Sequence, residues 1–359
     1  MSATFGKNLR VTIFGESHSA AIGVVIDGLP AGMRIKEEEY QLAMARRAPN
    51  TSAASTKRRE KDEIEILSGY FRGAATGTPL TAVIRNTDTR SQDYEKTLAL
   101  LRPGHADYTG MVKYHGANDY RGGGHFSGRL TAPLVFAGNL ARQYLSGQGI
   151  EVGVHILEVA GIADRPFDCA EQFSEVEKKY FPVFFDEAGR KMQAEIEKAR
   201  MEGDSVGGIM ECVVMGVPAG VGEPFFDSVE SRMAHMMFSI PAVKGIEFGS
   251  GFSITKLRGS AANDSPVVDQ NGSISFRTNH NGGINGGITN GMPIVLRVAL
   301  KPTPSISKIQ KTVNVDTMEN DTLQIVGRHD ACIVPRAAEV IKGAAALVIA
   351  DLLLEAKHG

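Results

Sequence analysis

Residues 102–132, RPGHADYTGMVKYHGANDYRGGGHFSGRLTA, are the segment that most constrains how this 359-residue chain can fold. Titratable and cationic side chains are too dense here for a hydrophobic core. Three successive glycines at 122–124 also cost conformational entropy, with no structural return evident from the sequence. Such a segment suits a loop that brings backbone amides and imidazoles to an anionic ligand. Its histidines are His105, His115 and His125, and a place on the solvated surface suits His115 taken alone.

The composition indicates a globular protein whose anion site is local. Hydrophobic residues make up 42% of the chain and charged residues 22%, which allows a sizeable core. The formal net charge is -2, so no overall basic surface for nucleic acid or a membrane is expected. No apolar run approaches membrane-spanning length, and the N-terminus lacks a signal-peptide pattern. We therefore expect a cytoplasmic protein with no nucleic-acid and no membrane partner.

The cysteines predict neither a disulfide framework nor a zinc site. Cys169, Cys212 and Cys332 are odd in number, far apart and outside any CxxC spacing. This usage is typical of a reducing compartment, and no metal site is expected.

Hydrophobic periodicity predicts a mixture of helices and strands. The predicted helices are 37–47, 131–145, 186–202, a segment from 229 that ends before Pro241, and 336–357. The predicted strands are 9–14, 24–26, 64–69, 81–85, 152–162, 206–215, 245–254 and 294–300. Asp227 is expected to cap the helix that begins at 229, and Met233 and Met237 are expected to fill the core. Residues 258–272 are expected to form a polar loop.

Two further segments are candidates for ligand binding. A second glycine-rich loop at 279–291 (NHNGGINGGITNG) leads through a strand to the loop 301–305 (KPTPS), and could accept a planar or phosphate-bearing cofactor. A dinucleotide-binding fold is rejected, because a strand and not a helix follows these glycines. Lys57, Arg58 and Arg59 form either a solvated face or a mobile basic lid over a phosphate, and the sequence supports both alternatives equally.

The candidates for chemistry are histidines, one aspartate and a set of arginines. Histidines can act as acids near neutral pH, and arginines bind carboxylates and phosphates through two parallel hydrogen bonds. No nucleophile elbow, phosphate-binding P-loop or metalloprotease motif is present, so elimination or proton transfer is favoured over hydrolysis. The candidates are His18, His105, Asp330, Arg47, Arg102, Arg129, Arg328 and Arg336.

Seven segments resemble the chorismate synthase family and follow one another in the family's order. They are GESHS (15–19), RPGHADYT (102–109), YRGGGHFSGRLTA (120–132), AVKGIEFGSGF (242–252), NHNGGINGGI (279–288), KPTPS (301–305) and GRHDACIVPRA (327–337). The length is similar to that of the compact bacterial type.

The resemblance implies an α+β fold with helices sandwiched between two antiparallel β-sheets, as a single domain over residues 1–359, assembled as a homotetramer. It implies a lyase of the shikimate pathway, in aromatic amino acid biosynthesis. The reaction is a 1,4-anti-elimination of phosphate from 5-enolpyruvylshikimate 3-phosphate, which gives chorismate. The family requires reduced FMN, although no net redox change occurs. NADPH and an external flavin reductase are the candidate sources of reducing equivalents.

The same resemblance implies roles for individual residues. His105 would protonate the leaving phosphate, His18 would stabilise or protonate the reduced flavin, and Asp330 would accept a proton relayed through the flavin. The implied substrate ligands are Arg47, Arg102, Arg129 and Arg336. The implied cofactor ligands are His125, Phe126, Ser127, Pro241, Ala242, Gly286, Lys301, Pro302, Thr303, Pro304, Ser305 and Arg328.

The sequence departs from the family pattern after the glycine triplet. Where the family has Arg-Ser-Ser-Ala-Arg-Glu, residues 125–130 read His-Phe-Ser-Gly-Arg-Leu, so His125 would have to supply part of the missing charge. Two other classes of function remain as alternatives. One is a flavin-independent enzyme that uses His105 covalently on a phosphate, and the other is a nucleic-acid-binding module that uses residues 57–61.

Overall fold

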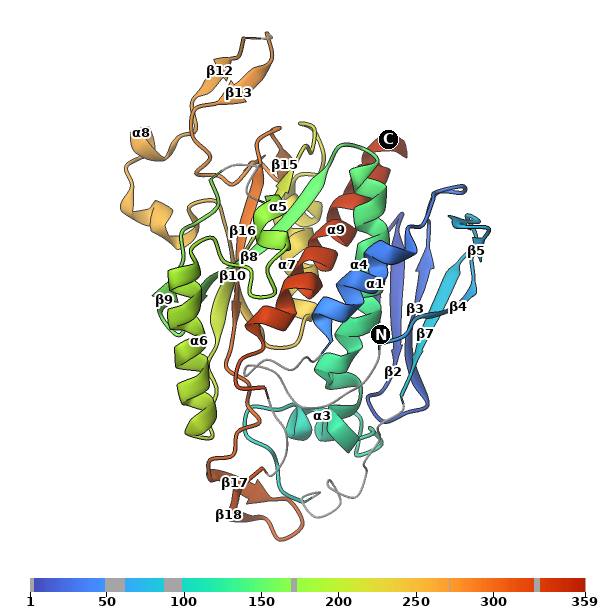
Figure 1. The fold of residues 1–359 in the computed structure, drawn as a ribbon, viewed down its shortest axis with the longest axis vertical. Helices are drawn as coiled ribbons and strands as arrows, with labels where there is room; N and C mark the ends of the chain where they lie inside the picture. The colour runs from blue at the N-terminus through green and yellow to red at the C-terminus, as the bar shows by residue number, and fades with distance from the viewer. Residues whose placement is uncertain are drawn as a thin grey trace.

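Two antiparallel sheets enclose a layer of helices (Figure 1). The computed structural model describes residues 3–48, 62–86, 99–168, 173–270, 272–325 and 330–358. The first sheet has the strand order β1-β2-β3-β7-β4, with β1 Thr4–Phe5, β2 Arg10–Gly15, β3 Ala21–Asp27, β7 Leu80–Arg85 and β4 Glu65–Ser68. The second has the order β11-β16-β10-β8-β9, with β11 Val243–Phe248, β16 Ile294–Leu300, β10 Gly208–Met215, β8 Glu151–Val159 and β9 Ile162–Ala163. The expected α+β architecture, with helices between two antiparallel sheets, is confirmed.

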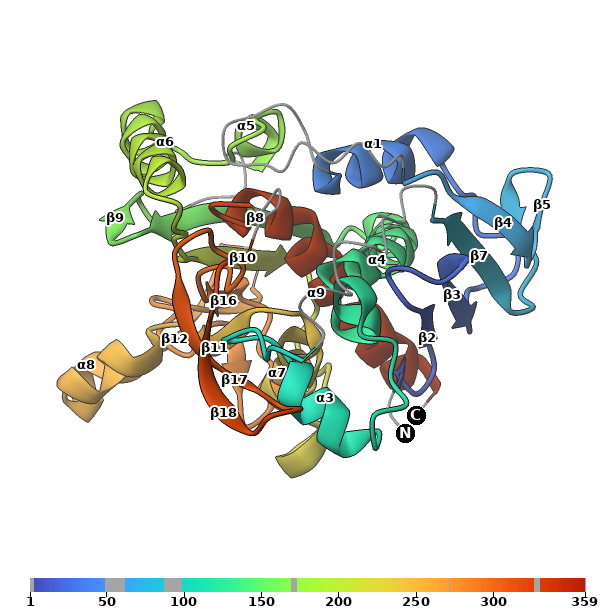
Figure 2. The same ribbon diagram turned by 90° about the horizontal axis from the view of Figure 1, so that it is seen from below.

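The helices of the central layer connect the two sheets. They are α1 Glu37–Arg47, α4 Thr131–Ser146, α7 Val229–Ser239 and α9 Val334–His358. Helix α4 packs on the first sheet and α9 on the second, and the two helices pack on each other (Figure 2). Their crossing is close because glycines meet there: a Cβ added to Gly138 would lie 2.3 Å from the Cα of Gly343. One cluster of buried apolar side chains therefore runs from the first sheet through the helices to the second.

A buried carboxylate fixes the N-terminal segment to the central layer. Asp351 of α9 has no exposed surface, and it accepts hydrogen bonds from the backbone N–H groups of Lys7, Asn8 and Leu9 at 2.7–3.1 Å. The guanidinium of Arg232, on α7, also donates to it. These bonds stabilise the start of the first sheet against two helices of the layer.

Shorter elements lie around this framework. The helical ones are α3 Asp107–Lys113, η1 Arg121–Phe126, η2 Gly128–Leu130, α5 Phe173–Glu177, α6 Asp186–Met201, η4 Phe225–Asp227, η5 Gly251–Lys256 and α8 Gly259–Ala262. The strands are β5 Tyr70–Phe71, β6 Ala74–Ala75, β12 Pro266–Val268, β13 Ile274–Phe276, β14 Ile284–Asn285, β15 Ile288–Thr289, β17 Gln310–Asn314 and β18 Glu319–Leu323. Figure 1 shows α8 and the β12–β13 hairpin projecting at one end, with α3 and the β17–β18 hairpin at the opposite end.

Several predicted elements have the predicted bounds or core face. Helix α1 and strand β16 agree with the predictions residue for residue. The helix predicted for 186–202 is α6, and Met192, Ile196 and Ala199 lie on its buried face. Met233 and Met237 are fully buried core residues, so their prediction is confirmed too.

Other predictions were wrong for local reasons. Ser228, and not Asp227, caps α7, because its hydroxyl accepts from the backbone N–H of Ser231 at 3.0 Å while Asp227 pairs with Lys7. The segment 152–162 is broken by a turn at residues 160–161, both of which have positive φ. The strand predicted for 245–254 ends at Phe248 and gives way to η5, and the supposed loop 258–272 contains α8 and β12.

Cys212 and Cys332 are buried and not disulfide-bonded, and burial raises the pKa of both thiols. Cys169 lies outside the described residues. None of the helices in the described ranges combines the length and the apolar character needed to cross a membrane.

Candidate functional site

The glycine triplet has a structural purpose that the sequence did not reveal. Gly122, Gly123 and Gly124 all have positive φ, a conformation that favours glycine. A Cβ on Gly122 would lie 2.2 Å from Cε1 of His18, and one on Gly124 would lie 2.0 Å from the carbonyl oxygen of Asp119. The triplet therefore lets η1 lie directly against the loop that carries His18.

His18 lies in the turn between β2 and β3 and is only 6% exposed. Its Nδ1 is 3.0 Å from the hydroxyl of Ser17, which donates to the carbonyl of Arg121 at 3.1 Å. The backbone N–H of Ser17 donates to the carbonyl of Gly124 at 3.2 Å. Ser17 thus holds the imidazole, and η1 in turn holds Ser17.

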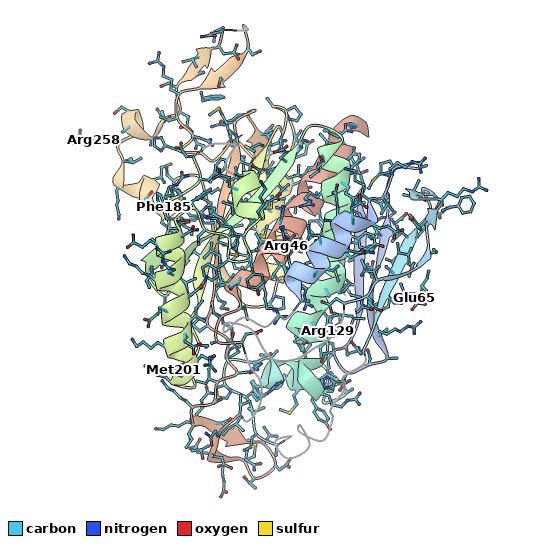
Figure 3. All side chains as sticks on the ribbon, in the orientation of Figure 1. Arg46, Glu65, Arg129, Phe185, Met201 and Arg258 are labelled. Carbon is cyan, nitrogen blue, oxygen red and sulfur yellow. The ribbon has the colours of Figure 1, made fainter. Side chains whose placement is uncertain are left out.

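Two of the predicted substrate arginines share one buried carboxylate. Asp62 accepts from Nη1 of Arg47 at 2.6 Å and from Nη1 of Arg129 at 2.9 Å. The side chain of Asp62 is 1% exposed, that of Arg47 5% and that of Arg129 6%. The pKa of Arg47 is lowered, and burial is the largest cause. Asp62 acts to raise this pKa, whereas the positive charges of Arg336 and Arg129 lower it further. The site thus holds several guanidinium groups close together at the end of α4 where Figure 3 labels Arg129.

Asp330 and Arg336 join the same network. Arg336 donates from Nη1 to Asp330 at 2.5 Å and from Nε to the carbonyl oxygen of Arg47 at 3.1 Å. The predicted base and three of the four predicted substrate arginines are therefore connected. The predicted neighbour Arg328 lies outside the described residues, as do Lys57, Arg58 and Arg59.

His105 lies against the KPTPS loop, although 200 residues separate it from Ser305 in sequence. Its Nε2 is 2.8 Å from the Ser305 hydroxyl, and Lys301 donates from Nζ to the carbonyl of Gly104 at 2.7 Å. The backbone N–H of Lys301 donates to the carbonyl of Ala242 at 2.9 Å. Three segments that the sequence assigned to catalysis or cofactor binding are therefore brought together: His105, Pro241 with Ala242, and residues 301–305.

Arg102 is paired within its own loop. Its Nε and Nη2 donate to the two carboxylate oxygens of Asp107 at 2.8 and 2.6 Å, and its backbone N–H adds a third bond at 2.9 Å. Burial acts to raise the pKa of Asp107, but the hydrogen bonds and charge of Arg102 lower it overall. A ligand that binds Arg102 has to do so beside this ion pair.

Helix α3 connects the His105 loop to the glycine triplet. A Cβ on Gly110 would lie 2.9 Å from the ring of Phe126, which is 40% exposed. His125 is exposed, and its Nδ1 is 2.8 Å from the carbonyl of Gly15, which ends β2 just before the His18 loop. The side chain of Ser127 caps η2 by accepting from the N–H of Arg129 at 3.3 Å. The three predicted cofactor residues 125–127 thus lie between the two histidine loops.

Among the described residues, the predicted cofactor residue Gly286 lies away from residues 301–305. Gly286 lies in the turn between β14 and β15. The loop just before this turn is hydrogen-bonded to Val295, at the beginning of β16. Lys301 follows the other end of β16, and seven residues of strand span roughly 20 Å. Within one copy of the chain, the position of Gly286 therefore does not support a contact with the same cofactor as residues 301–305.

Asp62 and Asn86 are site residues that the sequence reasoning missed. Asp62 precedes β4 and Asn86 directly follows β7, and Oδ1 of Asn86 accepts from Nε of Arg129 at 2.7 Å. Asn86 directly follows a buried strand, and polar residues at such a position often belong to a site, so this pattern would have identified it. No comparable pattern marks Asp62, because its partners come from α1 and η2.

Comparisons with known proteins show which family this chain is similar to. The family model described as chorismate synthase matches residues 9–354. The chorismate synthase of Dehalococcoides mccartyi is 48% identical over 359 residues, which cover 99% of this chain and 98% of the relative. That of Korarchaeum cryptofilum is 46% identical over 357 residues, again 99% and 98% of the two chains. A crystal structure of a chorismate synthase superposes with a TM-score of 0.78 at 29% identity, covering 99% of this chain and 94% of that one.

Proposed function

The chain belongs to the chorismate synthase family of lyases, and we propose that its His18, His105 and Asp330 loops form one reaction centre for phosphate elimination. The family acts in aromatic amino acid biosynthesis, and the proposed substrate is 5-enolpyruvylshikimate 3-phosphate. One observation carries the proposal. Hydrogen bonds and ion pairs connect the predicted base with three substrate arginines, Asn86 links Arg129 to the His18 loop, and His105 lies against the KPTPS loop.

Substrate binding is assigned to the arginines. A small molecule with two carboxylates and a phosphate needs several bidentate donors, and arginine provides them with a fixed planar geometry. Arg47, Arg129 and Arg336 come from three different elements but converge through Asp62 and the carbonyl of Arg47. Arg102 is assigned to the same substrate from the His105 side.

The family uses a flavin, and we propose FMN in its reduced form, bound beside residues 301–305. The fit is supported by an orphaned buried atom: Oγ1 of Thr303 has no hydrogen-bond partner among the described residues. Lys301, Ala242 and Ser305 lie around it in the same pair of loops, and residues 125–127 are assigned to the same cofactor. Bound reduced flavin supplies electron density to the reacting ring, which is chemistry that the side chains themselves lack.

The protein residues then bind, orient and move protons. His105 donates a proton to the phosphate oxygen as the C–O bond breaks, and the Ser305 hydroxyl holds its Nε2 in place. His18, nearly buried beside Ser17, stabilises the charge of the reduced cofactor. Asp330 is the final acceptor of the ring proton, oriented by Arg336. The products are chorismate and phosphate, so electrons and protons balance without net oxidation.

We further propose a single domain over the whole chain, a homotetramer and a cytoplasmic location. The continuous apolar core across both sheets supports the single domain, and the family resemblance supports the tetramer. NADPH, directly or through an external flavin reductase, is proposed as the source of electrons.

An anaerobic assay tests the proposed function. The purified protein is mixed with the phosphorylated substrate, with and without chemically reduced FMN, and chorismate and phosphate are measured. Equimolar products that form only with reduced FMN are expected. Phosphate release without flavin would instead support a flavin-independent enzyme that uses His105 on the phosphate.

A further inference from the structure

Asp62 lies where three distant parts of the chain meet. Arg47 ends α1, Arg129 lies in η2, and Asp62 precedes β4, yet all three side chains are almost fully buried and in contact. The two guanidinium groups carry like charges, and each has one oxygen of the same carboxylate. Without this carboxylate, two buried positive charges would repel each other and separate.

Such an arrangement is a poor choice for stability alone. Buried charges lose their hydration, and well-packed apolar side chains of similar volume often stabilise a protein as well or better. Arg47 makes two further hydrogen bonds in this network. Its Nε donates to the hydroxyl of Thr131 at 3.2 Å, and its Nη2 donates to the carbonyl of Gly128 at 3.1 Å. The side chain of Arg47 is thus held at each nitrogen, which is what a binding group needs and a core filler does not.

Asn86 connects this arginine pair to the His18 loop. Its Oδ1 accepts from Nε of Arg129 at 2.7 Å, while its Nδ2 donates to the carbonyls of Glu16 at 3.1 Å and Ser19 at 2.8 Å. Glu16 and Ser19 lie on either side of His18 in the same turn. A displacement of Arg129 is therefore transmitted through one amide to the backbone around the imidazole.

We propose that Asp62 and Asn86 are positioning residues of the reaction centre. Asp62 holds the guanidinium groups of Arg47 and Arg129 side by side for an oxyanion of the substrate. Asn86 sets the distance from this pair to His18. The inference rests on the proposed function and adds to it two residues that act through others and do not touch the reacting atoms.

The two residues are expected to affect different steps. Asp62→Asn keeps the shape of the side chain but removes the charge that holds two guanidinium groups together. The dissociation constant of the phosphorylated substrate should therefore rise by about 10–100-fold, as expected for losing charge-assisted geometry. Asn86→Ala leaves the arginine pair on Asp62 but releases the His18 turn. It should lower kcat by about 10–100-fold with a smaller change in KM, because catalysis depends steeply on position.

Asp164→Asn is a matched control. Asp164 is 7% exposed, directly follows the edge strand β9 of the second sheet, and accepts from the backbone N–H groups of Phe184 at 2.5 Å and Phe185 at 3.1 Å. The control should lower the melting temperature but leave substrate affinity and kcat unchanged. Substrate binding is measured by calorimetry without flavin, turnover anaerobically with reduced FMN, and melting temperature for every variant.

The outcomes separate this inference from the proposed function. Three results together support the inference. The wild-type protein turns over, Asp62→Asn binds the substrate more weakly, and Asn86→Ala turns over more slowly. Unchanged or tighter substrate binding by a folded Asp62→Asn protein overturns the role of Asp62. If that variant does not fold, Asn86→Ala decides, and a normal kcat overturns the proposal. A wild-type protein that neither binds nor converts the substrate overturns the proposed function, and this inference with it.

Discussion

Replacing Gly122 by alanine should slow turnover by about 100-fold, because it displaces His18 without removing any group. The added Cβ would lie 2.2 Å from Cε1 and 2.4 Å from Nδ1 of His18. Ordinary van der Waals contact begins at 3.4 Å. The distance from the added Cβ to Cε1 therefore has to grow from 2.2 to 3.4 Å, which displaces the imidazole by about 1.2 Å. A misplacement of about 1 Å in a reaction centre can reduce the rate 100-fold. Because φ of Gly122 is 60°, the substitution also strains the backbone by about 1–2 kcal/mol.

Gly123→Ala is the matched control for this backbone strain. Its φ is 87°, and an added Cβ would meet nothing nearer than the Cβ of Ser127 at 3.9 Å. Both variants should lose a similar amount in melting temperature, but only Gly122→Ala should lose the rate of a single anaerobic turnover with reduced FMN. Equal turnover by the two folded variants would refute the reasoning, since it would mean that the position of His18 does not limit the reaction.

Three further substitutions test other parts of the site and fold. His105→Ala should lower single-turnover rate by about 10²–10⁴-fold while leaving flavin affinity nearly unchanged; an unstable protein with normal chemistry would make His105 a loop anchor. Asp330→Asn keeps the shape beside Arg336 but loses basicity, so it should bind substrate and flavin normally and form chorismate far more slowly; a normal pre-steady-state rate would assign the proton to another acceptor. Asp351→Ala should lower the free energy of unfolding by about 3–5 kcal/mol, because it leaves the Arg232 guanidinium and backbone N–H groups buried without their acceptor. Denaturant titration measures this, with Asp227→Ala, a 40%-exposed carboxylate expected to contribute under about 1 kcal/mol, as the control.

The sequence by itself determined the elements whose cause is local. Helix α1 has the bounds predicted for 37–47, and its sequence begins with acids and ends with arginines, which complements the helix dipole. Strand β16 is an apolar run interrupted only by Arg297, so its bounds could be predicted from the residue types alone. The motifs around His18, His105 and Asp330 were likewise visible as short segments, because each combines catalytic residue types within a few positions.

Only the tertiary structure decided how those segments meet. His105 finds Ser305 and Arg47 finds Asp62 because the sheets and the α4–α9 crossing bring their loops together, and no periodicity in the sequence encodes such distances. The same holds for the glycine triplet, whose purpose depends on a close approach to His18. Gly286, in contrast, belongs to a matching motif but lies at the far end of β16. A motif predicts which residue types are present, whereas packing across the chain decides which of them share a site.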